Sequence, residues 1–184
     1  MPQSDRRRKR KVKGSDLLIR GLEDEGVKCI FGIPGEETLD IMQSICKSKT
    51  KIKFVTTRCE WGAALMAASY GRLTGKTGVC LVTCGPGVLN LPNGAGYAFL
   101  GGAPLLMIGG QKPIKSRPQA GFQRIDAVAV MKPVTKLAIQ IASAQLIPST
   151  VRESFRVTQE GKQGPVYLEL PDDIAAEKCE EEEV

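Results

Sequence analysis

The sequence contains no histidine and no CxxC pair, and aromatic residues make up only 5% of its 184 residues. Six cysteines are present, and most of them lie inside apolar runs. Without histidine or paired cysteines, a structural zinc site is not expected. The cysteines are instead expected to be reduced, buried thiols of a cytoplasmic protein.

Long apolar runs are also missing. No stretch approaches the ~20 apolar residues of a membrane helix, and the basic N-terminus is not followed by the apolar segment of a signal peptide. The sequence therefore predicts no membrane association.

The formal net charge of +6 comes largely from one N-terminal segment, RRRKRKVK (6–13). Such a block is typical of a disordered arm, so we predict an arm over residues 1–13 and an acidic tail over residues 176–184. The arm could alternatively be a nuclear-localisation or nucleic-acid-binding segment. Because it contains no aromatic residue and no binding motif follows it, a nucleic-acid partner is the less favoured interpretation.

Residues 14–175 are predicted to form one α/β domain. Apolar runs at 27–33, 54–57, 79–83, 105–108, 133–141 and 166–170 read as strands, and the segments between most of them have helical periodicity. A proline at position 92 is expected to kink or interrupt one helix, and residues 109–121 are expected to form a polar loop. This alternation predicts a six-stranded parallel sheet with helices on both faces.

Ligands of open parallel sheets bind beyond the carboxyl ends of the strands. The unusual turns of this sequence all follow predicted strands, at 32–37, 58–60, 84–90 and 109–123. Gly85-Pro86-Gly87 resembles a phosphate-binding loop, but neither GxGxxG nor GxxxxGK[ST] occurs. Nucleotide binding by this domain is therefore not expected.

Glu60 stands where one predicted strand passes into a helix. A carboxylate in the first helical turn stabilises the helix by about 0.3–1 kcal/mol, which is the purely structural interpretation. The following residues are unusually small, and such a surface would let either another helix or a flat ring approach closely. The stretch alone leaves both interpretations open.

Several segments resemble the N-terminal, pyrimidine-binding domain of thiamine-diphosphate enzymes, and most closely that of acetolactate synthase large subunits. They are FGIPGEE (31–37), TTRCEWGAALMAASYGRLTGKTGVCLVTCGPG (56–87), GGQ (109–111), GFQRID (121–126) and GPVYLELPDD (164–173). They occur in the family's order and spacing. The resemblance covers residues 14–173 and implies thiamine diphosphate as the cofactor.

The resemblance also implies roles for individual residues. Glu60 matches the family's catalytic acid/base, which exchanges a proton with N1′ of the aminopyrimidine. Gly35 and Glu36 match a turn that approaches the neighbouring subunit's cofactor. Gly87 and Asn90, in the turn after the third strand, are assigned to cofactor binding as well.

Phe122 and Gln123 match the family's substrate side, although core packing of Phe122 and a surface amide at Gln123 remain alternatives. The sequence also departs from the family. Cys59 and Trp61 replace a histidine and a glutamine beside Glu60. Lys132 stands where some FAD-containing synthases have arginine, which leaves bound FAD doubtful.

The family's diphosphate and magnesium are held by a separate domain with a GDG…N segment, which these residues do not contain. The resemblance therefore implies that this chain supplies no metal ligand and needs a diphosphate-binding domain on another polypeptide, in a homo- or hetero-oligomer. The implied reaction is decarboxylation and carboligation of a small 2-oxo acid, as in branched-chain amino acid biosynthesis. The alternatives are a non-catalytic binding or regulatory partner of an intact thiamine-dependent enzyme and an alpha-type subunit of a split decarboxylase.

Overall fold

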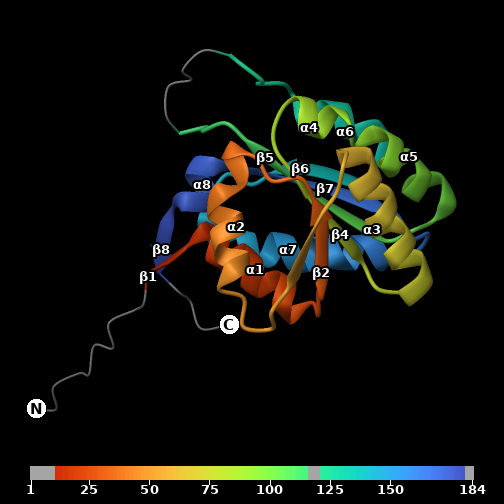
Figure 1. Cartoon of the computed structure of the whole chain (residues 1–184), viewed down its shortest axis with the longest axis horizontal. Coiled ribbons are helices and arrows are strands. Elements are labelled where there is room, and N and C mark those ends of the chain that lie inside the picture. The colour runs from red at the N-terminus through yellow and green to blue at the C-terminus, as the bar shows by residue number, and fades with distance from the viewer. Residues whose placement is uncertain (1–10, 116–120, 181–184) are drawn as a thin grey trace, which may run out of the picture.

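The computed structural model describes residues 11–115 and 121–180, and its centre is a six-stranded parallel sheet between two layers of helices (Figure 1). Adjacent strands all pair in parallel register. The predicted fold class is confirmed. In sheet order the strands are β3 (Lys53–Thr56), β2 (Cys29–Gly32), β4 (Gly78–Val82), β5 (Leu105–Gln111), β7 (Pro165–Pro171) and β6 (Leu137–Gln140).

Each face of the sheet is covered by its own group of helices (Figure 1). One layer consists of α1 (Gly14–Asp24), α2 (Leu39–Cys46), α7 (Ile147–Gln159) and α8 (Asp172–Ala176). The other consists of α3 (Glu60–Thr74), α4 (Pro86–Leu89), α5 (Pro92–Gly101) and α6 (Ala127–Met131). Short 3-10 turns occur at Glu36–Thr38, Lys132–Val134 and Ala144–Leu146.

Two apolar cores form because successive side chains of a strand point to opposite faces. Leu81 and Ile108 belong to the core under α1 and α7, whereas Cys80 and Met107 belong to the core under α3 and α5. Every residue of β4 is buried. The prediction that this strand is covered on both faces is therefore confirmed.

Helices α3 and α5 touch closely at Gly94, where a Cβ atom would lie 2.3 Å from the Cβ of Ala64. We expect Gly94→Ala to lower the free energy of unfolding by about 1–3 kcal/mol, because the added methyl group would push the helices apart. Gly96 on the same helix is the control, since a Cβ there would meet nothing within 4 Å. Urea denaturation should show Gly96→Ala unchanged or stabilised by about 0.5–1 kcal/mol. Equal stabilities of the two variants would contradict this close approach.

One expected interruption is confirmed, and two element boundaries differ from the sequence prediction. The proline at 92 does interrupt the helix, since α4 ends at Leu89 and α5 begins at Pro92. β5 continues to Gln111 where we predicted a loop from residue 109, because β7 supplies pairing partners as far as Pro171. The strand predicted at 133–141 starts only at Leu137, after a 3-10 turn that contains a proline.

The two ends of the domain also differ from the prediction. β1 (Lys11–Lys13) pairs antiparallel with β8 (Lys178–Glu180). The predicted arm and acidic tail are therefore wrong for these strand residues, whose buried members, Val12 and Cys179, join the apolar core. Residues 1–10 and 181–184 lie outside the described part of the chain.

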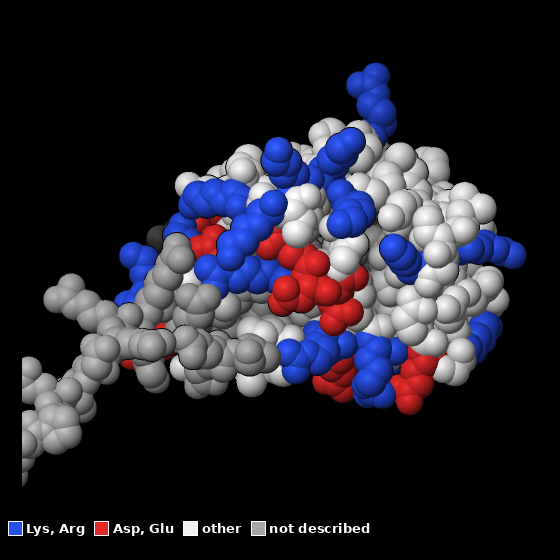
Figure 2. Space-filling model, turned by 90° about the horizontal axis from the view of Figure 1, so that it is seen from below, with Lys and Arg blue, Asp and Glu red and all other residues white. Residues whose placement is uncertain are grey.

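Charges of both signs are mixed on the surface. Figure 2 shows acidic side chains between basic ones over the face that it presents. Several surface charges of the described residues are paired, for example Lys13 Nζ with Asp40 Oδ1 at 2.6 Å. No helix within the described residues has both the length and the hydropathy that a membrane span requires.

Candidate functional site

Glu60 is the first residue of α3, and its carboxylate is directed toward α4 at the carboxyl end of β4. Asn90 Nδ2 donates a hydrogen bond of 2.8 Å to Glu60 Oε2. A Cβ atom on the buried Gly87 would lie 3.8 Å from Glu60 Oε1. The structure thus brings together three of the predicted site residues, and the carboxylate is only partly buried.

The Thr83 side chain lies against two glycines near Glu60, namely Gly35 and Gly87. A Cβ on Gly35 would lie 2.4 Å from the Cβ of Thr83, so only glycine fits at this position. A Cβ on Gly87 would lie 3.1 Å from Thr83 Cγ2. Gly35, just before a 3-10 turn, and Gly87, in α4, therefore approach the same side chain.

A buried ion pair lies next to Thr83. Glu37 is 3% exposed, and it accepts a hydrogen bond from the Thr83 hydroxyl and pairs with Lys112 Nζ. Burial raises the pKa of Glu37, but the hydrogen bonds from Lys112 and Thr83 lower it further, to about 2. Glu37 is therefore ionised at neutral pH, and it anchors the turn that carries Gly35.

Cys84 borders this ion pair but has no nucleophilic character. Burial raises the pKa of its thiol to about 11, and the charge of Glu37 contributes in the same direction. The thiol is therefore protonated at neutral pH, and a thiolate is the form that reacts.

The remaining predicted site residues lie on exposed loops. Glu36 is exposed, and its carboxylate lies 3.8 Å from Lys112 Nζ. Phe122 is 73% exposed, so the alternative that it packs in the core is wrong. Gln123 has a left-handed φ of 60°, and its carbonyl oxygen would lie 2.4 Å from a Cβ on Gly85. The loop of Gln123 therefore packs on the turn that leads to Gly87.

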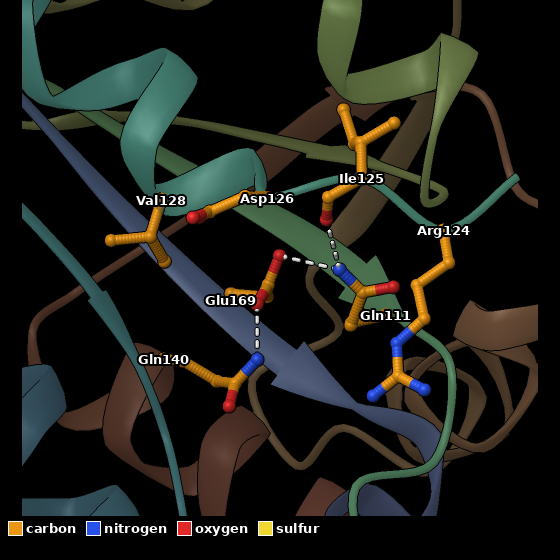
Figure 3. A pocket seen from close by; sticks show the side chains of 7 residues that line it. All are labelled: Gln111, Arg124, Ile125, Asp126, Val128, Gln140 and Glu169. Atoms are coloured by element: carbon orange, nitrogen blue, oxygen red, sulfur yellow. Dashed lines mark hydrogen bonds between the residues drawn. The ribbon is translucent and has the colours of Figure 1, made fainter. Parts of the chain in front are cut away.

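A second polar cluster, which we did not predict, lies at the carboxyl ends of β5, β6 and β7 (Figure 3). Glu169 is 2% exposed and accepts hydrogen bonds from Gln111 Nε2 at 2.9 Å and from Gln140 Nε2. Burial raises the pKa of Glu169, and the two amide hydrogen bonds only partly oppose this rise. A signal existed in the sequence, because Glu169 is the only charged residue of its otherwise apolar strand.

The surroundings of Glu60 fit an aminopyrimidine ring. One carboxylate oxygen is held by Asn90, and the other lies beside a glycine that leaves room for a flat group. Within the described residues, no three side chains of His, Cys, Asp or Glu are arranged to hold a metal ion. The site therefore offers a carboxylate with a glycine beside one of its oxygens.

Comparison with known families is decisive here. The chain matches a protein family described as "Thiamine pyrophosphate enzyme, N-terminal TPP binding domain" over residues 12–130. This range includes Glu60, Gly87, Asn90, Phe122 and Gln123. The chain belongs to the thiamine pyrophosphate enzymes. The matched range corresponds to the N-terminal TPP-binding domain of this family.

Relatives of this thiamine pyrophosphate enzyme domain include several acetolactate synthases. It is 38% identical over 163 residues to a probable acetolactate synthase large subunit of Methanocaldococcus jannaschii, covering 89% of this chain and 27% of the relative. It is 38% identical to a catabolic acetolactate synthase of Raoultella terrigena, covering 88% of this chain and 28% of the relative. An acetolactate synthase of Arthrospira platensis is 37% identical, covering 94% of this chain and 30% of the relative. The chain thus spans between a quarter and a third of the length of these relatives.

Proposed function

We propose that this domain supplies the pyrimidine half of a thiamine-diphosphate site of the acetolactate synthase type, with Glu60 as its catalytic acid/base. The observation that carries the proposal is the contact of Glu60 with Asn90 and Gly87 at the carboxyl edge of the sheet. The names of the relatives support the reaction class, decarboxylation and carboligation of a small 2-oxo acid.

Bound thiamine diphosphate supplies an electron sink for the decarboxylation of a 2-oxo acid. In this arrangement Asn90 holds Glu60 Oε2, which leaves Oε1 to hold or release a proton at a ring nitrogen. The proton exchange requires this oxygen to lie within hydrogen-bond reach of the ring. Gly87 keeps the space beside Oε1 free of side-chain atoms.

The other predicted residues are assigned to the borders of the site. Gly35 and Glu36 belong to the turn proposed to approach a neighbouring subunit's cofactor. The Glu37–Lys112 ion pair and Thr83 fix the position of this turn. Phe122 and Gln123 are proposed to line the substrate side, because their loop packs on Gly85.

An exposed apolar surface begins at the same helix as Glu60. We call it the apolar helix face, and its members lie on α3, on α5 and at the end of α4: Trp61, Met66, Leu73, Leu89, Tyr97 and Leu100. Exposed apolar patches of this kind mark interaction sites. Trp61 directly follows Glu60 in α3, so a protein that covered this face would lie beside Glu60. We therefore propose that the diphosphate-binding partner docks here.

The partner proposal can be tested with the unmatched remainder of the M. jannaschii relative as a separate polypeptide. We expect a complex with this chain, and we expect Met66→Glu and Leu100→Glu each to weaken it by about tenfold or more, because each would bury an unpaired charge. Leu146→Glu is the matched control, since Leu146 is 51% exposed and belongs to the 3-10 turn that leads into α7, in the other helix layer. Isothermal titration calorimetry measures all four affinities. Failure of the unsubstituted chain to bind, or equal effects of the three variants, would contradict the proposed docking face.

A further inference from the structure

The polar cluster around Glu169 forms the floor of a pocket of about 530 Å³ (Figure 3). The pocket opens at the carboxyl ends of β5, β7 and β6, and the segment 124–128 forms its roof. None of its lining residues belongs to the Glu60 site or to the apolar helix face. Its lining residues are Gln111, Arg124, Ile125, Asp126, Val128, Gln140 and Glu169.

The floor of the pocket is held rigidly by internal hydrogen bonds. Gln111 Nε2 donates two hydrogen bonds, one of 2.9 Å to Glu169 Oε1 and one of 3.2 Å to the carbonyl oxygen of Ile125. Gln140 Nε2 donates to the other oxygen of Glu169, and the hydroxyl of Tyr167 donates to Oε1 at 3.3 Å. Because Gln111 and Glu169 are both buried, this network ties the roof segment to the strands beneath it.

The groups left to interact with a ligand are Arg124 and Asp126. Arg124 lies at one end of the pocket in Figure 3, beside Gln111. No carboxylate of residues 11–115 or 121–180 forms an ion pair with its guanidinium. Asp126 uses Oδ1 to accept a hydrogen bond of 2.9 Å from Ala129 N, and its second oxygen has no such bond among the described residues.

These groups define the chemistry of the ligand. A guanidinium fork binds a carboxylate in bidentate fashion, and the free oxygen of Asp126 and the amide oxygen of Gln140 accept hydrogen bonds. Ile125 and Val128 supply an apolar wall suited to a short aliphatic group. We propose that this pocket binds a small aliphatic carboxylic acid that also carries a hydroxyl or amino group.

Such a ligand would also act on the neighbouring loop. Arg124 directly follows Gln123, whose backbone packs on Gly85. A ligand held between Arg124 and the floor therefore fixes the segment that leads from Gln123 into α6. This pocket and its ligand do not require thiamine diphosphate or a partner protein, so they can be tested with this chain alone.

The test is a titration of the full 184-residue chain with three acids of the same carbon number: L-lactate, L-alanine and propionate. Calorimetry and amide chemical shifts report binding, and the shifts are expected at Ile125 and Val128. We expect saturable binding of L-lactate, L-alanine or both, and an affinity for propionate at least about tenfold weaker, because propionate lacks the donor. Binding of only one of the two identifies the donor as hydroxyl or ammonium. Saturation by neither, or equally tight binding of propionate, would overturn the proposal.

Two substitutions locate the binding. Arg124→Gln is expected to lower the affinity about tenfold or more, whereas Arg72→Gln, the same change on the exposed surface of α3, leaves it unchanged. Asp126→Asn keeps the helix cap, because asparagine caps as well as aspartate. This variant should lower the affinity for L-alanine more than the affinity for L-lactate, since a carboxylate binds an ammonium group more strongly than a hydroxyl. An Arg124→Gln protein with unchanged affinity would place the binding elsewhere and refute the proposed pocket.

Discussion

Replacing Glu60 with glutamine is expected to lower thiamine-dependent pyruvate turnover by about 10²–10⁴-fold, measured with the chain combined with a diphosphate-binding partner. Glutamine has the same length as glutamate, and its amide oxygen can still accept the hydrogen bond from Asn90 Nδ2. It cannot gain or release a proton at a ring nitrogen. The loss should therefore appear in kcat, with the association of the two proteins unchanged.

The control for this experiment is Glu153→Gln, which makes the same chemical change on the exposed surface of α7. It should leave turnover as it is in the unsubstituted complex. Thermal melting of both variants checks that each is folded. If the Glu60→Gln complex keeps more than about a tenth of the activity, proton exchange by this carboxylate is not needed, and the proposed catalytic role is wrong.

Replacing Lys112 with methionine is expected to destabilise the protein by about 3 kcal/mol, because it leaves the buried carboxylate of Glu37 without its cation. This figure is the lower end of the usual range, since the Lys112 side chain is 27% exposed and water can reach the site. The hydrogen bond from Thr83 remains but cannot neutralise the charge. Urea denaturation at pH 7 measures the loss of stability.

A second substitution and a pH series test the same cause. Adding Glu37→Gln to Lys112→Met should recover most of the loss, because the unpaired charge is then gone. The pKa of Glu37 lies at about 2 in the folded protein, below its ordinary 4.5. Its contribution to stability is therefore complete above about pH 4.5 and disappears as the pH falls toward 2. The unsubstituted protein and Lys112→Met should accordingly approach equal stability in acid, and a constant difference would contradict this assignment.

The strands and the place of the site could be predicted in part from the sequence. Apolar runs identified all six strands of the large sheet, and the signal was strongest for β4, β5 and β7, which are buried along their whole length. The position of Glu60 between a strand and a helix also placed it at the carboxyl edge. Its contact with Asn90 required the structure, because thirty positions separate them along the chain.

Pairings between distant residues had no visible signal in the sequence. Glu37 and Lys112 lie on different loops, and each reads as an ordinary surface charge until the parallel strands bring the loops together. The pairing between the two ends of the domain was likewise not visible in the sequence. Lys11–Lys13 carries the charge typical of an arm. Its one apolar side chain, Val12, is nevertheless buried in the core, and the segment pairs as a short strand with Lys178–Glu180.

The antiparallel pairing of β1 with β8 holds the first and last described strands together at one corner of the molecule. Figure 1 shows this corner at the opposite side from α3 and α5. A fluorescent label introduced at an exposed residue of these strands, such as Lys11 or Lys178, would therefore lie on the opposite side of the molecule from α3 and α5 (Figure 1). Immobilisation through such a position would present α3 and α5 to the solution, which suits surface-based measurements of partner binding.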